Sequence, residues 1–152
     1  MENKKTFLFL DDDAFHPEKI RHMRYYYPLI GAEEILKIAQ NSEIQLNTTV
    51  EGAIDYIEKN GCPNFISFDN DLQRDLEGLD LAKWLIEKDL DNPGFIPKDF
   101  KFFVHSQNII AKEKIYSRLN QYLSVREFPE EKVSLEEKKE KVTKKSSPRM
   151  KR

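Results

Sequence analysis

Three short hydrophobic runs in this 152-residue chain each end in a cluster of acids, amides or a histidine. The runs are Phe-Leu-Phe-Leu at 7–10, Phe-Ile-Ser-Phe at 65–68 and Phe-Phe-Val at 102–104. The clusters that follow them are Asp-Asp-Asp at 11–13, Asp-Asn-Asp at 69–71 and His-Ser-Gln-Asn at 105–108. Short apolar runs separated by helical stretches are typical of buried parallel strands. Because ligands bind outside the carboxyl ends of such strands, the three clusters together indicate one site.

The rest of the pattern predicts an α/β fold. Ile44 and Leu46 alternate with polar residues as in a short strand, and residues 125–128 could add a fifth, short edge strand. Aliphatic residues at helical spacing predict helices over 31–41, 50–57, 79–86 and 111–123, and in the long connection after the first strand. Thr48 and Glu51 have capping-box spacing at the start of the helix at 50–57, and Gly61 closes that helix. Right-handed crossovers then give a three-layer α/β/α sandwich of the flavodoxin-like, receiver-like kind. Its parallel sheet has four to five strands in the order 2-1-3-4-5, which places the acids of strands one and three side by side.

Composition divides the chain into a domain and a tail. Residues 1–129 have enough apolar material for one core, whereas residues 130–152 carry nine Lys/Arg against five Glu and almost nothing to bury. We expect that tail to be disordered. The net charge of −2 points strongly to neither nucleic acid nor membrane, and no apolar run approaches the ~20 residues of a membrane span. Cys62 is the single cysteine, so no internal disulfide can form and a cytoplasmic location is expected.

Several carboxylates at one sheet edge repel one another unless a cation neutralises them. Mg²⁺ suits such a site, because it is bound by one or two carboxylates, waters and phosphate oxygens; Mn²⁺ is the second choice. The simpler alternative is that these acids cap helices and turns, where Asp and Asn are common. That alternative fits any one cluster alone, and the coincidence of three clusters favours a metal site.

The third cluster contains a histidine and two hydroxyl or amide side chains. His105 ends an aromatic-rich strand, where its imidazole could act as a general acid or base near neutral pH. Asn108 fits equally well as the N-cap of a helix that begins at Ile109, and Ser106 could hold a turn.

An acid pair after strand one, an Asp after strand three and Ser106 after strand four resemble the response-regulator receiver domain. That domain has a Lys before a Pro at strand five, where this chain has Phe128 and Pro129. The chain is more similar to the cyclic-phosphate-processing receiver domains, whose usual motifs are Leu-Asp-Asp, Ser-Leu-Asp-His-Asp-Leu, a Gly before the third helix and His-Ser-x-Asn. Over residues 6–128 this chain has, in the same order, Leu10-Asp11-Asp12, Ser67-Phe68-Asp69-Asn70-Asp71-Leu72, Gly78-Leu79-Asp80 and His105-Ser106-Gln107-Asn108.

The resemblance implies a metal-dependent phosphoesterase that acts on a cyclic phosphate, either in a nucleotide or at an RNA end. Carried over by position, the metal or water ligands are Asp11, Asp12, Asp69 and Asp71. The catalytic residues are Asp69 and His105, and the substrate contacts are Asn70, Ser106 and Asn108. One position departs from the family, because Asn70 stands where the family usually has His.

Two other functions remain open from the sequence. In a haloacid-dehalogenase-like phosphatase, Asp11 would be the nucleophile and Asp13 the acid, although the Thr usual two residues later is Phe15 here. A catalytically silent receiver-like module would bind a partner through the same edge or through the tail. Turnover of linear monoesters, turnover of cyclic phosphates, or neither, separates the three possibilities.

Overall fold

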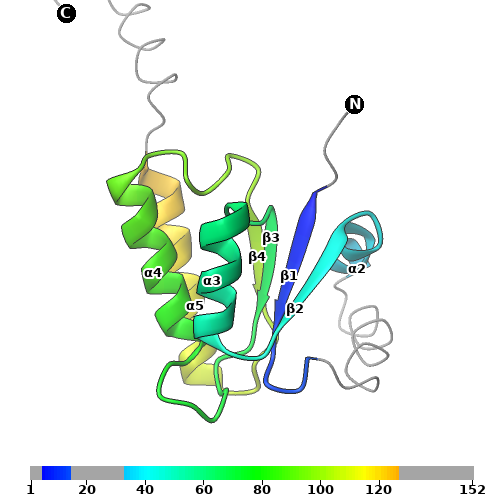
Figure 1. The fold of residues 1–152 in the computed structure, drawn as a ribbon. Coiled ribbons are helices and arrows are strands. Elements are labelled where there is room, and N and C mark those ends of the chain that lie inside the picture. The colour runs from blue at the N-terminus through cyan, green and yellow to red at the C-terminus, as the bar shows by residue number, and fades with distance from the viewer. Residues whose placement is uncertain (1–4, 15–32, 127–152) are drawn as a thin grey trace, which may run out of the picture.

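The computed structural model describes residues 5–14 and 33–126 of the chain (Figure 1). In chain order the elements are β1 (Thr6–Leu10), α2 (Glu33–Gln40), β2 (Glu43–Asn47), α3 (Val50–Asn60), β3 (Phe65–Phe68), α4 (Gly78–Asp91), β4 (Lys101–Val104) and α5 (Ile109–Val125). The strands pair in parallel in the order β2-β1-β3-β4. The predicted α/β fold is confirmed, and β1 lies beside β3 as expected.

The predicted fifth strand at 125–128 is not among the strands that the described residues form. Val125 is instead the last residue of α5, and residues 127–128 lie outside the described part. The predicted tail, 130–152, and the helix expected soon after the first strand also lie outside it, so the division at residue 129 stays a prediction. Among the helices that are described, none is long and apolar enough to cross a membrane.

The sheet has a helical layer on each face (Figure 1). Because side chains alternate along a strand, Leu8 and Leu10 of β1 face one side, where they pack with α3, α4 and α5. Phe7 and Phe9 face the other side and pack with residues of α2. All four are 3% exposed or less, and burial of each such side chain contributes about 1.5–3 kcal/mol. β1 is therefore buried on both faces from Phe7 to Leu10, and Asp11 is the first polar residue after it.

The N-cap of α3 differs by one residue from the sequence-based prediction. The spacing of Thr48 and Glu51 suggests a capping box, but Thr49 is the N-cap, and its hydroxyl oxygen accepts the Gly52 N–H at 3.0 Å. Two adjacent threonines offer the same side chain, and only the path of the chain from β2 decides which one caps. The end of α3 is as predicted, because Gly61 closes it with φ of 90°, a conformation that favours glycine.

Candidate metal and phosphate site

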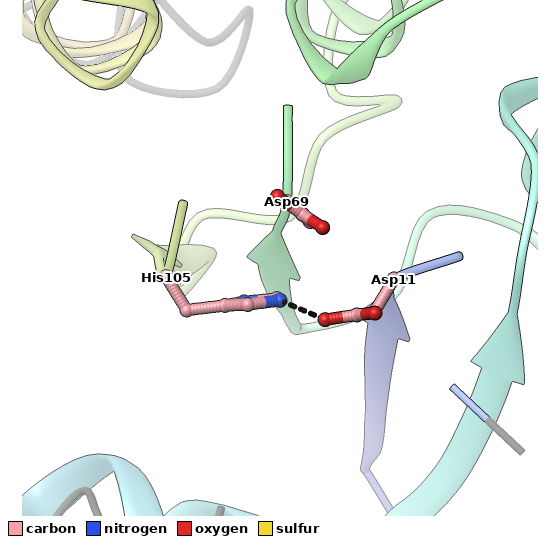
Figure 2. A group of neighbouring side chains, drawn as sticks. All are labelled: Asp11, Asp69 and His105. Atoms are coloured by element: carbon pink, nitrogen blue, oxygen red, sulfur yellow. Dashed lines mark hydrogen bonds and ion pairs between the residues drawn. The ribbon is translucent and has the colours of Figure 1, made fainter. Parts of the chain in front are cut away.

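The register of the sheet sets three polar residues in one row. Leu10 pairs with Phe68, which pairs with Val104, so the residue after each of these strand ends stands at the same level. The backbone pairing continues one step further, with the Asp69 N–H donating to the Leu10 carbonyl at 2.9 Å and the His105 N–H donating to the Phe68 carbonyl at 2.8 Å. Asp11, Asp69 and His105 therefore lie along the carboxyl edge of β1, β3 and β4 (Figure 2).

The side chains of His105 and Asp11 meet across the end of β3. The Nε2 atom of His105 lies 3.0 Å from Oδ2 of Asp11, which is 1% exposed (Figure 2). The other carboxylate oxygen of Asp11 accepts the Asp13 N–H at 2.8 Å. Because an ionised carboxylate only accepts hydrogen bonds, Nε2 carries the hydrogen of this contact. The carboxylate is thus buried with a donor on each oxygen.

The imidazole of His105 is fixed on its other side as well. Its Nδ1 atom is hydrogen-bonded to the Ser67 hydroxyl at 2.8 Å. The ring stacks on Phe9, with 4.7 Å between centroids and 7° between planes. Ser67 is fully buried, and its contact with His105 is not predicted from the sequence. The sequence could have indicated the contact, because Ser67 lies two residues before Asp69 and therefore on the same face of the strand.

Asp11, Asp69 and His105 could hold a divalent ion. Each offers one donor atom, and the three atoms lie within 4.8 Å of one another. Asp11 also forms a second such group with Asp12 and Asp13, of which Asp12 is half-buried and Asp13 exposed. The predicted convergence of the acids of strands one and three with His105 is therefore present, and a set of carboxylates with one imidazole fits a divalent metal.

Asp71 belongs to neither of these groups and makes different contacts. Its Oδ1 atom accepts from the side-chain amide of Asn70 at 3.1 Å and from that of Asn108 at 3.3 Å. Asn70 is 8% exposed, and its Oδ1 accepts the Leu79 N–H at 3.0 Å. Asp71 is itself exposed. The structure therefore places Asp71 and Asn70 as ties between the loops that follow β3 and β4.

Gly78 explains how the loop after β3 is held. A Cβ atom at this position would lie 2.3 Å from the Asp69 carbonyl oxygen and 3.0 Å from the Asn70 Cα atom. The Gly78 N–H donates to the Asn70 carbonyl at 3.1 Å. The first turn of α4 thus packs directly on the backbone of the site, at a distance that only glycine permits.

Ser106 and Asn108 show the capping and turn contacts that the sequence allows. The side-chain carbonyl of Asn108 accepts the Ala111 N–H at 3.0 Å, so Asn108 is the N-cap of α5. The Ser106 hydroxyl oxygen accepts the Asn108 N–H at 3.1 Å. The predicted phosphate contacts of these two residues remain predictions, and both residues lie at the same edge as His105.

The end of β4 is anchored from α5. The Val104 N–H donates to the Tyr116 hydroxyl oxygen at 3.2 Å. Burial raises the pKa of Tyr116 above its usual value, so the hydroxyl stays protonated at neutral pH. This contact fixes the residue that directly precedes His105.

A parallel sheet of order 2-1-3-4 with acids after strands one and three defines a receiver-like domain. More specifically, the chain belongs to the family of cyclic-phosphate processing receiver domains, because that family's model matches residues 6–121. A search of curated proteins found no match. One similar solved structure is a yeast Spc42 trimeric coiled-coil segment fused to another structure, with 12% identity, a TM-score of 0.41, and coverage of 97% of this chain and 98% of that chain. A likeness of that size carries no argument.

Proposed function

We propose that this protein is a metal-dependent phosphoesterase that binds and opens a cyclic phosphate, in a nucleotide or at an RNA end. The observation that carries the proposal is the group formed by Asp11, Asp69 and His105, whose donor atoms lie within 4.8 Å of one another at the carboxyl edge of the sheet. Membership in the cyclic-phosphate processing family supports the choice of substrate.

The cofactor we propose is Mg²⁺, with Mn²⁺ as the alternative. Asp11 and Asp69, with Asp12 beside them, supply the carboxylate oxygens that both ions prefer. When bound, such an ion polarises phosphoryl oxygens and makes water a stronger nucleophile.

Opening the ring adds one water molecule. The water oxygen bonds to phosphorus, one ring P–O bond breaks, and the released oxygen takes a proton. We assign that proton to His105, because its Nε2 atom carries a hydrogen toward Asp11 at the same edge and the ring is held by Ser67 and Phe9. Asp69, which is half-buried in the same group, accepts the proton that the water loses.

The phosphate oxygens are assigned to side-chain donors at the same edge. Asn70 and Asn108 each donate one amide hydrogen to Asp71, and an amide nitrogen carries two. Ser106 uses its oxygen to accept the Asn108 N–H, which leaves its hydroxyl hydrogen as a donor. These three residues can therefore hold a phosphate without giving up the contacts that shape the loops.

The test is hydrolysis of a 2′,3′-cyclic nucleotide with Mg²⁺, with Mn²⁺ and with a chelator. We expect turnover only with a metal, and a loss of about 100-fold or more in Asp69→Asn. Asp55→Asn is the matched control, because this acid is exposed on α3 and pairs with Lys59, at 3.2 Å. Turnover of linear monoesters instead would favour a dehalogenase-like phosphatase, and a folded protein without any turnover would favour the silent module.

A further inference from the structure

A groove runs between α4 and α5, which lie side by side (Figure 1). It consists of two adjoining pockets of about 380 and 700 Å³. Leu79, Ile110 and Lys114 line both pockets, so the two are continuous. Ile110 is 69% exposed, which is unusual for an isoleucine and leaves an apolar surface inside the groove.

One end of the groove adjoins the loops that follow β3 and β4. Its first pocket is lined by Asn70, which directly follows Asp69, and by Asn108, which caps α5. The second pocket continues along α5 as far as Gln121. At a rise of 1.5 Å per residue, the distance from Asn108 to Gln121 is about 20 Å. A single nucleotide fills only the first part of that length.

The second pocket of the groove is basic within an acidic body, whereas the first pocket, next to the loops of the site, has Glu77 and Asp80 against Lys114. The described residues hold 12 Lys/Arg against 19 Asp/Glu, a net charge of −7. The second pocket reverses this balance, with Lys83, Lys114 and Arg118 against Glu113. All three cations are exposed, and no ion pair within the described part of the chain neutralises them. Lys114 and Arg118 are four residues apart and so lie on the same helix face.

We propose that this groove holds the ribose-phosphate chain of an RNA strand whose terminal cyclic phosphate occupies the site. The inference rests on the proposed function: if the cyclic phosphate at the end of an RNA strand occupies the site, the rest of the strand must lie along the protein surface next to it. The three cations would contact backbone phosphates. Since no aromatic residue is among the described residues that line the groove, binding depends on salt more than on base sequence.

The experiment measures binding of a fluorescent single-stranded oligoribonucleotide that ends in a 2′,3′-cyclic phosphate. The full chain is used in the Asp69→Asn background, so that the strand is not consumed. One variant carries Lys83→Gln, Lys114→Gln and Arg118→Gln. The matched control carries Lys37→Gln, Lys59→Gln and Lys101→Gln, three exposed lysines away from the groove. Both variants keep the basic residues of 127–152, so any contribution from that segment is the same.

We expect the groove variant to bind the strand about tenfold more weakly. The slope of the logarithm of its binding constant against the logarithm of salt concentration should fall in magnitude by about 2, because each phosphate that a removed cation no longer neutralises accounts for about 0.7. Its preference for the strand over a cyclic mononucleotide should disappear, and the control variant should keep that preference. Equal weakening in the two variants would overturn the inference, as would displacement of the RNA by polyglutamate at a similar concentration. If the unsubstituted protein has no turnover and the groove variant still binds the strand more weakly than the control, the proposed catalytic function is wrong, but the groove does bind RNA.

Discussion

Nε2 of His105 lies 3.0 Å from Oδ2 of Asp11, although β3 separates the strands that carry them. The imidazole reaches across the end of β3 and closes the row of polar groups at the sheet edge. A buried carboxylate needs such a donor, since an unpaired one is costly. The same geometry brings a group that can exchange protons next to the carboxylates that we propose as metal ligands.

The first prediction is that Asp69 contributes to metal binding and Asp71 does not. A metal that binds only the folded state should raise the melting temperature, by the equivalent of about 2.7 kcal/mol at a hundredfold excess over Kd. Asp69→Asn should remove most of this shift. Asp71→Asn should keep it, because Asp71 bonds Asn70 and Asn108 and lies outside both groups. Thermal melts with and without Mg²⁺ or Mn²⁺ test this, and the opposite ranking of the two variants would contradict it.

Much of the fold can be predicted because its signals are local. The hydrophobic runs at 7–10 and 65–68 mark β1 and β3, and the rule for strand order makes them neighbours. The predicted N-cap of α3 is wrong by one residue, since Thr48 and Thr49 have the same capping chemistry. The possible fifth strand cannot begin at Val125, which is the last residue of α5, and residues 127–128 lie outside the described part of the chain.

The second prediction concerns Ser67. Ser67→Ala should lower the free energy of unfolding by about 1–3 kcal/mol, because Nδ1 of His105 loses its buried partner. The ring nitrogens should also shift in NMR spectra, which a purely structural change elsewhere would not cause. Ser124→Ala, at an exposed position, should stay within about 0.5 kcal/mol. Unchanged ring-nitrogen shifts in Ser67→Ala would show that Ser67 does not position the imidazole.

The third prediction concerns the close packing at Gly78. Gly78→Ala should cost about 2–3 kcal/mol or more, because the new Cβ would lie 2.3 Å from the Asp69 carbonyl oxygen and must displace it. The metal-induced shift in melting should shrink as well. Gly94→Ala is the control: its φ of 93° is strained for alanine, but nothing lies within 4 Å of the added Cβ. It should cost only about 1 kcal/mol and leave the metal shift intact. Equal effects of the two changes would argue against a role of Gly78 in the site.

The site can be predicted only in part, for physical reasons. A run of residues shows which side chains end a strand, but not where the chain bends after it. Spacing in extended backbone groups Asp71 with Asp69, whereas the chain bends at Asn70 and turns Asp71 toward Asn108. Ser67 escapes prediction because a small polar residue in a buried strand gives no local sign of its partner, which is 38 positions away.

The fourth prediction concerns which residue carries the proton. His105→Ala should reduce turnover of a cyclic phosphate by about 10²–10⁴-fold. Asn70→His should raise it by less than about tenfold, since Asn70 is buried and its oxygen already accepts the Leu79 N–H. Steady-state kinetics on the two variants decide the matter. An active His105→Ala protein, together with a more active Asn70→His protein, would move the proton role to position 70.

The most direct measurement is anomalous scattering from a crystal soaked with Mn²⁺. We expect one strong peak in bonding contact with the carboxylates of Asp11 and Asp69 and next to His105. The peak should be absent from Asp69→Asn crystals under the same soak. Peaks confined to exposed acids such as Asp71, or none at a saturating concentration, would contradict a metal site at the ends of these three strands.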